Sequence, residues 1–302
     1  MENKNLVTAI ITTHNRPELC KEAIRSVFDQ TYKNIECIVV DDASNEKSSN
    51  SLQKYISDYY PDTQYIYISS KESKGGNHAR NIGVNMSKGA FIAFLDDDDE
   101  WLPTKIEEQI ALIESNPSIG FVYCGRIYET NFDKDSRLEE DIQNNKYRDG
   151  NLKKEILIHI LTVTSTILVK KELITEAGLF DEELHSWQEY DLCIRILQQT
   201  QCGLVRKNLV LYRIISTDKN RVSNKVKVWE QDVKYINKKY ENLINSLTLS
   251  EKNKRRAYIY IDGINRARNA KRTVYIIKYV LLMIFDIGAG FEIIKKLINT
   301  HL

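Results

Sequence analysis

The chain has 302 residues, which is enough for one large domain or two of ordinary size. Its composition, 42% hydrophobic and 28% charged, is ordinary for a soluble globular protein. A net charge of +1 gives no global reason to expect nucleic acid, and five scattered cysteines without a CxxC pair predict neither a zinc site nor a disulfide framework.

The first half of the chain alternates strand and helix signals. Apolar runs predict strands at residues 6–12, 35–40, 64–69 and 90–95. Helical spacing of apolar residues predicts helices at 17–30, 48–59, 77–86 and 103 to about 114. This order predicts an α/β fold with a doubly wound, mainly parallel sheet.

The second half is more mixed. Strands are expected at 120–128, 165–169 and 204–214, and helices at 153–161, from 170 to 177, and at 188–199. The polar stretch 131–150 is expected to be a surface loop, and helices alone are expected from about 226. We therefore predict a catalytic domain at 1–225, with a nucleotide-binding half at about 1–100 and an acceptor half at about 101–225, and a helical region at 226–302.

A run of four aspartates, residues 96–99, directly follows the apolar strand at 90–95. In open α/β sheets, ligands bind at the carboxyl ends of the strands. Crowded carboxylates raise one another's pKa unless a cation neutralises them, and hard divalent cations prefer such oxygen ligands. The run therefore indicates a metal site; the alternative is a solvated acidic loop.

Three motifs occur in order: THNRPE after the first strand, VVDDAS after the second, and GGNHARNIGVNMSKGAFIAFLDDDDEWLP around the fourth. Together they resemble the bacterial family 2 glycosyltransferases, which have the GT-A fold. The resemblance covers roughly residues 5–220. It implies a sugar-transferring enzyme that uses a nucleotide-sugar donor.

The resemblance implies that residues from all three motifs form a nucleotide-binding site. Thr12, His14 and Arg16 would border the base and ribose, although the family usually has Tyr where His14 stands. Asp42 would accept a hydrogen bond from the uracil N–H, and Arg80 would lie against the nucleotide. The alternatives are a plain loop for His14, a capped turn for Asp42 and a helix-surface position for Arg80.

Within the aspartate run, Asp96-Asp97-Asp98 matches the family's DxD motif. The resemblance implies that Asp98 ligates Mn²⁺ or Mg²⁺, and that Asp96, with Asp97, contacts the nucleotide sugar. The metal would bridge the diphosphate and stabilise charge on the leaving nucleoside diphosphate. Asp99 would either orient the sugar or cap the helix that follows.

The segment SWQEYDLCIR, residues 186–195, carries the family's acidic pair, with Gln188 in place of the first acid. Glu189 matches the second acid, which is the usual general base, and Asp191 is the alternative. Both acids could instead be favoured simply by the helix dipole. Trp187 could stack on a sugar or fill the core.

The chain departs from many relatives after the strand at 204–214, because the usual His is missing there. Arg213, Lys219 or Arg221 are candidates to neutralise the diphosphate in its place.

The C-terminal region combines a basic stretch with an apolar one. The basic residues are Lys252, Lys254, Arg255, Arg256, Arg266, Arg268, Lys271 and Arg272. The apolar run VYIIKYVLLMIF at 274–285 is too short to predict a spanning helix, and the N-terminus shows no signal peptide. Internal packing, self-association and contact with an anionic membrane surface remain alternatives for this region.

We therefore predict a metal-dependent, inverting glycosyltransferase, cytoplasmic or peripheral at the inner face of the membrane. It would transfer a sugar from a UDP-sugar to a glycan or lipid-linked oligosaccharide in cell-surface polysaccharide synthesis. Inversion follows from the resemblance. The alternatives are a catalytically silent nucleotide-sugar-binding subunit and a nucleotidyltransferase, although THNRPE is not the Gly-rich, basic loop that the latter would show.

Overall fold

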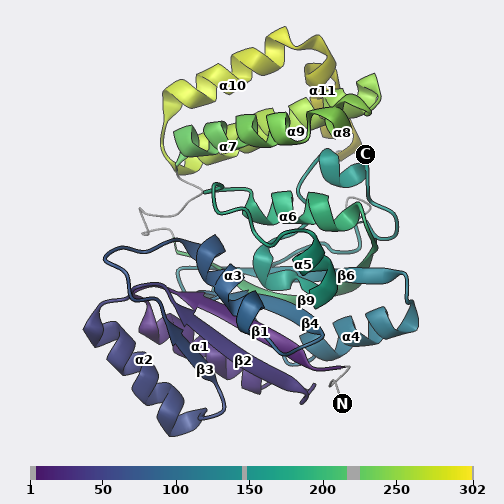
Figure 1. Cartoon of the computed structure of the whole chain (residues 1–302). Helices are drawn as coiled ribbons and strands as arrows, with labels where there is room; N and C mark the ends of the chain where they lie inside the picture. Colours follow the sequence, from purple (N-terminus) through teal and green to yellow (C-terminus); the bar gives the residue numbers. More distant parts are fainter. Residues whose placement is uncertain (1–4, 145–147, 216–224, 301–302) are drawn as a thin grey trace. The chain divides into compact units, whose positions relative to one another are not determined.

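The computed structural model describes residues 5–144, 148–215 and 225–300 (Figure 1). Four parallel strands form the N-terminal part of the sheet, in the order β3-β2-β1-β4. Their bounds are β1 Val7–Thr13, β2 Ile35–Asp41, β3 Gln64–Tyr67 and β4 Phe91–Asp96. β1 and β4 are buried along almost their whole length, which accounts for their near-continuous apolar sequences.

Nine strands of the described residues join this one sheet. The other five are β5 Glu100–Trp101, β6 Ile119–Thr130, β7 Asp133–Glu139, β8 Leu168–Lys170 and β9 Gln201–Ile214. β8 lies antiparallel between β4 and β6, while β6 and β9 pair in parallel. The predicted parallel sheet is confirmed in the first half, and the second half extends it with mixed pairings.

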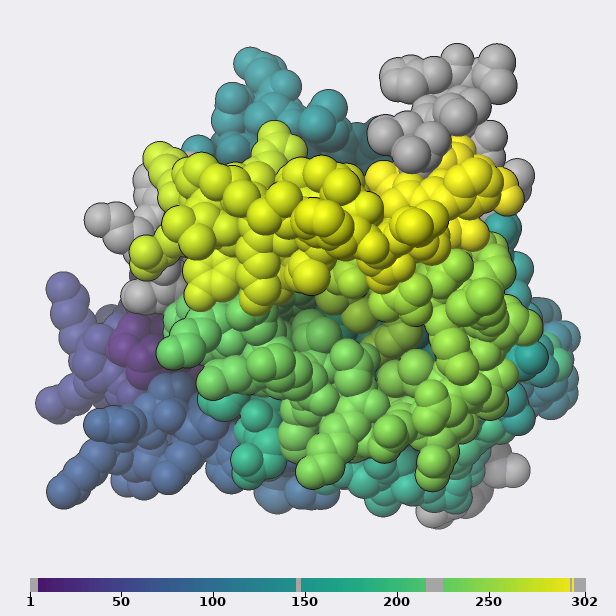
Figure 2. Space-filling view, turned by 90° about the horizontal axis from the view of Figure 1, so that it is seen from above, coloured from purple at the N-terminus to yellow at the C-terminus, as the bar shows by residue number. Residues whose placement is uncertain are grey.

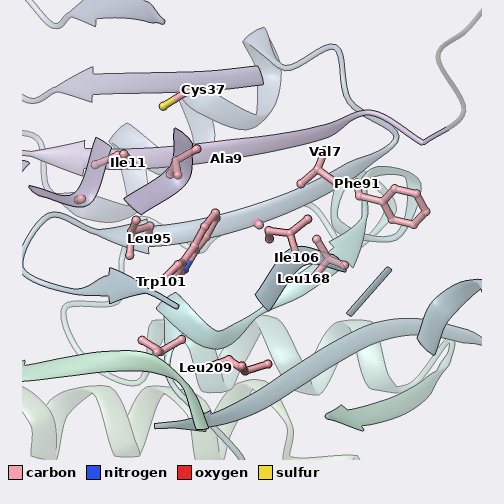
Figure 3. Packing of buried hydrophobic residues seen from close by; sticks show 14 of the residues in the cluster. Val7, Ala9, Ile11, Cys37, Phe91, Leu95, Trp101, Ile106, Leu168 and Leu209 are labelled. Atoms are coloured by element: carbon pink, nitrogen blue, oxygen red, sulfur yellow. The ribbon is translucent and has the colours of Figure 1, made fainter. Parts of the chain in front are cut away.

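Helices cover both faces of the parallel strands, as expected of a doubly wound sheet. The helices are α1 Pro17–Phe28, α2 Glu46–Tyr59, α3 Gly76–Met86 and α4 Lys105–Ser115. One face packs Val7, Ala9 and Ile11 of β1 with the apolar sides of α1, α2 and α4 (Figure 3). Ile38 and Val40 of β2 face the other way and pack with α3. The two-fold alternation of a strand produces this division.

Three expectations of the second half need correction. The stretch 131–150 is not wholly a loop, because β7 pairs with β6 in a hairpin. β7 is almost entirely exposed and highly charged, so it lacks the apolar alternation that marks a strand. The expected helix at 153–161 is a 3-10 turn at Glu155–Leu157. The strand expected at 165–169 begins only at Leu168, because Thr164–Thr166 forms a second 3-10 turn.

The chain divides into two compact units. One contains Met1–Leu152, Leu161–Glu182 and Arg195–Ser216; the other contains Lys153–Ile160, Glu183–Ile194 and Thr217–Leu302. The remaining helices are α5 Lys171–Glu176, α6 Gln188–Leu197, α7 Val226–Lys239, α8 Glu241–Asn245, α9 Leu249–Asn269, α10 Thr273–Phe285 and α11 Ile287–Thr300. The helical character expected after 226 is confirmed, and the domain boundary at 225 stays a prediction.

The second unit is built around an aromatic cluster. The Trp187 ring lies 5.7 Å from Trp229 and 5.2 Å from Tyr190, measured between centroids, and Trp229 lies 5.7 Å from Tyr279. Ser186 donates from its backbone N to Asp232 of α7 at 2.7 Å. The segment before α6 therefore packs with the C-terminal helices.

None of the helices in the described ranges is by itself long and apolar enough to cross a membrane. α10 and the start of α11 reach the necessary length and composition only as a pair, which is bent by 102°.

Candidate active site

The predicted nucleotide-binding residues meet at the carboxyl edge of the parallel strands. Thr12 at the end of β1 lies opposite Val40 of β2 and Asp96 of β4. Thr13 lies opposite Asp41, so Asp42 follows at the same level. Parallel pairing without a register shift thus brings residues from three distant parts of the sequence to one edge.

Asp42 is held by the loop that leads into α3. Its carboxylate accepts hydrogen bonds from the backbone N of Lys74 at 2.9 Å and of Gly75 at 2.7 Å, and from Ser73 Oγ at 2.5 Å. Gly75 has φ +96°, a conformation that suits glycine. The structure therefore places Asp42 in a preformed loop, and its contact with a base stays a prediction.

The loops after β1 and β2 are joined by side-chain hydrogen bonds. Asn15 donates from its backbone N to Ser44 Oγ at 2.7 Å, and its Oδ1 accepts from the backbone N of Asn45 at 2.8 Å. His14 Nδ1 lies 2.6 Å from the carbonyl oxygen of Asp42. Asn15 and Ala43 both have positive φ, near 57° and 58°. Positive φ is rare for residues other than glycine, and backbone strain of this kind clusters at functional sites.

The four aspartates alternate between partly exposed and buried. Asp96 and Asp98 have side chains 30% and 25% exposed, whereas Asp97 and Asp99 are buried. The first pair can meet a ligand, and the second pair faces the protein. The alternative of a solvated acidic loop therefore fails for half of the run.

Asp97 anchors Arg16. It accepts from Arg16 Nε at 3.1 Å and from Thr13 Oγ1 at 2.7 Å, while Arg16 also bonds Asp98 Oδ2 at 3.1 Å. Burial raises the pKa of Asp97 to about 7, and the charges of Asp98 and Asp96 add to this, although Arg16 opposes it. Such burial favours a supporting role for Asp97, and its direct contact with a nucleotide stays a prediction.

Asp99 joins two distant segments. It accepts from Ser165 Oγ at 2.6 Å and from the backbone N of Arg213 at 3.1 Å. Burial raises the pKa of Asp99 well above its usual range. Asp99 does not cap the next helix, because α4 begins later, after Thr104.

Arg80 is a buried residue of the site and not a helix-surface arginine. Its Nη2 bonds Asp96 Oδ1 at 2.6 Å, and its guanidinium lies 5.4 Å from the ring centre of Phe180. The Arg80–Asp96 ion pair fixes the carboxylate of Asp96, which the family resemblance assigns to the ribose region. Arg80 is thus placed to orient Asp96 and to present its remaining N–H groups beside it.

The metal prediction can be compared with the oxygen donors present. Across residues 5–144, 148–215 and 225–300, no three His, Cys, Asp or Glu side chains gather as a metal-binding group. Asp96 and Asp98 do offer partly exposed carboxylates, as the first and third residues of the tight turn at 96–99. One or two carboxylates suit a Mg²⁺-type ion that also takes substrate phosphates and water as ligands. The residues therefore fit a metal completed by the donor's diphosphate.

Glu189 and Asp191 occupy the first turn of α6 and differ in environment. Glu189 is partly exposed. Asp191 is fully buried, accepts from Tyr240 Oη at 2.6 Å and pairs with Lys239 Nζ at 2.8 Å. These contacts favour a structural role for Asp191 and leave Glu189 the better candidate base.

Trp187 precedes α6 with φ +59°, and its ring is buried. Its Nε1 donates to Asp262 Oδ2 at 3.1 Å. Of the two interpretations of Trp187, the structure therefore favours the core.

Arg213, a candidate to neutralise the diphosphate, is instead paired with three carboxylates of the protein. Its guanidinium pairs with Glu22 at 2.9 Å, with Glu129 at 3.3 Å and with Glu100. The other two candidates, Lys219 and Arg221, lie outside the described residues.

Sequence reasoning missed the residues that support the site. Thr13 donates to Asp97, and Ser165 donates to Asp99. The backbone N–H groups of Lys74 and Gly75 donate to Asp42. Ser165 is distant in sequence and carries no motif, so nothing local could have revealed it. For the loop that holds Asp42, Gly75-Gly76 was a signal, because paired glycines mark a turn.

This geometry agrees with the comparisons to known proteins. The family model described as "Glycosyl transferase family 2" matches residues 8–174, and the chain belongs to this family. It is a glycosyltransferase with the GT-A fold. The nucleotidyltransferase alternative is thereby set aside.

Several relatives and solved structures are similar over most of the chain. An uncharacterized glycosyltransferase of Methanocaldococcus jannaschii is 30% identical over 219 residues, 72% of this chain and 73% of the relative. One from Haemophilus influenzae is 27% identical over 98% of this chain and 94% of the relative. The mannosyltransferase PcManGT of Pyrobaculum calidifontis, solved with GDP-Man and Mn²⁺, superposes with a TM-score of 0.57 at 14% identity, covering 91% of this chain and 86% of that one. S. aureus TarS 1-349 in complex with UDP-GlcNAc also gives a TM-score of 0.57, at 13% identity over 94% and 90%.

Proposed function

We propose that the protein transfers a sugar from a UDP-sugar to a hydroxyl of a lipid-linked glycan. Escherichia coli WfaP, named as a UDP-Glc:alpha-D-GlcNAc-diphosphoundecaprenol beta-1,3-glucosyltransferase, supports both the donor and the acceptor class. It is 36% identical over 127 residues, 42% of this chain and 48% of WfaP. A cytoplasmic location and a role in cell-surface polysaccharide synthesis belong to the same proposal.

The observation that carries the donor proposal is the gathering of Asp42, Arg80, Asp96 and Asp98 at one edge of the sheet. A carboxylate such as Asp42 can accept from the imide N–H of uracil, whereas cytosine offers no N–H at that ring position. Arg80 and Asp96 are already joined at 2.6 Å, so they need little reordering when the ribose binds.

We further propose that Asp98 holds Mn²⁺ or Mg²⁺ together with the donor's diphosphate. The ion would supply positive charge beside the leaving diphosphate. Arg16 contacts both Asp97 and Asp98, and it would keep the carboxylate of Asp98 in position before the ion arrives.

For the acceptor hydroxyl, we propose Glu189 as the general base of a single, inverting displacement. Glu189 would accept the hydroxyl proton as the oxygen forms its bond to the anomeric carbon and UDP leaves. Partial exposure of Glu189 and burial of Asp191 support this choice over the alternative.

The test compares Glu189→Gln with wild type, using UDP-Glc and UDP-GlcNAc as donors and a GlcNAc-diphosphate-polyprenol acceptor. We expect Glu189→Gln to lower kcat by about 100-fold or more, because a positioned base typically contributes that much. Calorimetric binding of UDP should not change. Glu241→Gln, at an exposed glutamate of α8, is the matched control.

Two results would contradict the assignment. Turnover that survives in Glu189→Gln would exclude Glu189 as the base. A wild type that binds UDP but transfers no sugar from either donor would favour the silent subunit.

A further inference from the structure

α10 and α11 present large apolar side chains to solvent. The exposed residues are Val274, Ile277, Leu281, Leu282, Ile284, Phe285, Ile287 and Phe291, and we call this set the C-terminal apolar face. Phe285 and Ile287 are 79% and 84% exposed. Figure 2 shows α10 and α11, in yellow, on the side of their unit turned toward the viewer. Large apolar side chains that are exposed in a group, and not singly, point to an interaction site.

The orientation of α10 within its unit is fixed by the opposite side of the helix. Tyr279 is buried, and its hydroxyl donates to Glu230 Oε1 at 2.5 Å. Its ring packs so closely on Gly263 of α9 that a Cβ there would lie 2.7 Å from the ring. Val274, Ile277, Leu281 and Ile284 recur every three or four residues, so they share the outward side.

Positive charges accompany this face. Lys271 and Arg272 are exposed directly before α10. Lys278, the one charged residue in the sequence of α10, is 48% exposed and pairs with Glu230 Oε1 at 2.6 Å. Asp286, between the two helices, is paired with Arg256. The Arg256 guanidinium holds the pKa of Asp286 down at about 2. Exposed positive charge beside the face therefore comes from Lys271 and Arg272, and α10 itself contains no acidic residue.

The dimensions favour a helix lying on a bilayer over one crossing it. α10 has 13 residues, about 20 Å at 1.5 Å per residue, which is shorter than a hydrocarbon core of about 30 Å. The bend of 102° between α10 and α11 prevents the pair from forming one straight span.

We propose that the C-terminal apolar face docks on the surface of an anionic phospholipid bilayer. The apolar side chains would enter the boundary between headgroups and acyl chains, and Lys271 and Arg272 would meet lipid phosphates. A second copy of the chain is the alternative partner for this face. A two-fold symmetric contact would, however, bring the same positive charges of both copies together. The proposal concerns residues of α10 and α11, none of which belongs to the candidate donor site, and it does not depend on activity.

The test is sedimentation of the full chain with vesicles of phosphatidylcholine alone or with 30% phosphatidylglycerol. We expect binding to the anionic vesicles that weakens as salt rises, because exposed cations are screened. The double substitution Phe285→Gln/Ile287→Gln should reduce binding at least tenfold, and Lys271→Gln/Arg272→Gln should remove most of the preference for phosphatidylglycerol. Leu249→Gln, at an exposed leucine of α9, is the matched control.

Circular dichroism of each variant establishes that it is folded. Failure of folded wild type to bind anionic vesicles would overturn the proposal, as would equal binding by Phe285→Gln/Ile287→Gln. A dimer in analytical ultracentrifugation that this double variant dissociates, without vesicle binding, would assign the face to a second copy. Vesicle binding needs no nucleotide, so this result and the donor-site result can fail separately.

Discussion

At the scale of single residues, alternate members of the aspartate run have different tasks. Asp96 and Asp98 are partly exposed beside Arg80 and Arg16, whereas Asp97 and Asp99 bind groups inside the protein. The sequence indicated an acidic ligand site but not this division. Which carboxylates are buried depends on Thr13 and Ser165, and their positions follow from the sheet and not from the local sequence.

Lys105 is a buried lysine, and its burial should affect how the stability of the protein depends on pH. It is completely buried, bonds Gln109 Oε1 at 2.8 Å and lies 4.2 Å from the ring centre of Trp101. Burial lowers the pKa of Lys105 to about 8. Between pH 8 and 10.5 the unfolded chain holds more protons at this residue than the native protein, so the stability of the native state should rise with pH.

We therefore predict that wild type gains about 3 kcal/mol of unfolding free energy relative to Lys105→Met between pH 8 and 10.5. Urea unfolding at several pH values measures this difference. Lys54→Met, at an exposed lysine of α2, should follow wild type throughout. Parallel curves for Lys105→Met and wild type would show that Lys105 is not desolvated in solution.

At the scale of elements, the packing of α3 on β1 depends on Gly83. A Cβ at Gly83 would lie 2.5 Å from Ile10 Cγ2, which is inside any normal contact distance. Alanine is a better helix former than glycine by about 1 kcal/mol, so helix propensity predicts that Gly83→Ala raises the free energy of unfolding. The clash with Ile10 predicts that the same substitution lowers it. α3 also carries Arg80, so its distance from the sheet bears on the site.

We predict that packing dominates and that Gly83→Ala lowers the free energy of unfolding by about 1–3 kcal/mol. The loss should be smaller when measured in an Ile10→Ala background, because the clashing methyl group is then absent. Asn85→Ala, on the exposed side of α3, should be neutral or slightly stabilising. Stabilisation by Gly83→Ala would show that α3 moves away freely.

Some of the strands and helices could be predicted from the sequence, and others could not. β1, β2 and β4 are buried runs, and α1 and α3 have clear apolar spacing, so their bounds were predicted to within one or two residues. β7 was missed because an exposed edge strand needs no apolar alternation, and β5 because two residues show no period. Tertiary pairing with β6 and β9 defines these two strands.

At the scale of the whole molecule, the parallel order of the strands explains why the candidate donor site could be predicted. Residues that end neighbouring parallel strands must meet at one edge, so Thr12, Asp42 and Asp96 could be grouped from their positions alone. Glu189 and the C-terminal apolar face belong to the second unit, where the sequence signals helices but not what they contact. Only the structure separates Glu189 from Asp191 by burial, and only it shows which side of α10 is exposed.

The most direct test of the central claim is calorimetric titration with UDP, GDP, CDP and dTDP, each with and without Mn²⁺. We predict that UDP binds best, that binding requires Mn²⁺, and that Asp98→Ala weakens it at least tenfold because a metal ligand is lost. Asp58→Ala, at an exposed aspartate of α2, should bind like wild type. Binding of none of the four nucleotides, or UDP binding that Mn²⁺ and Asp98→Ala leave unchanged, would contradict the account.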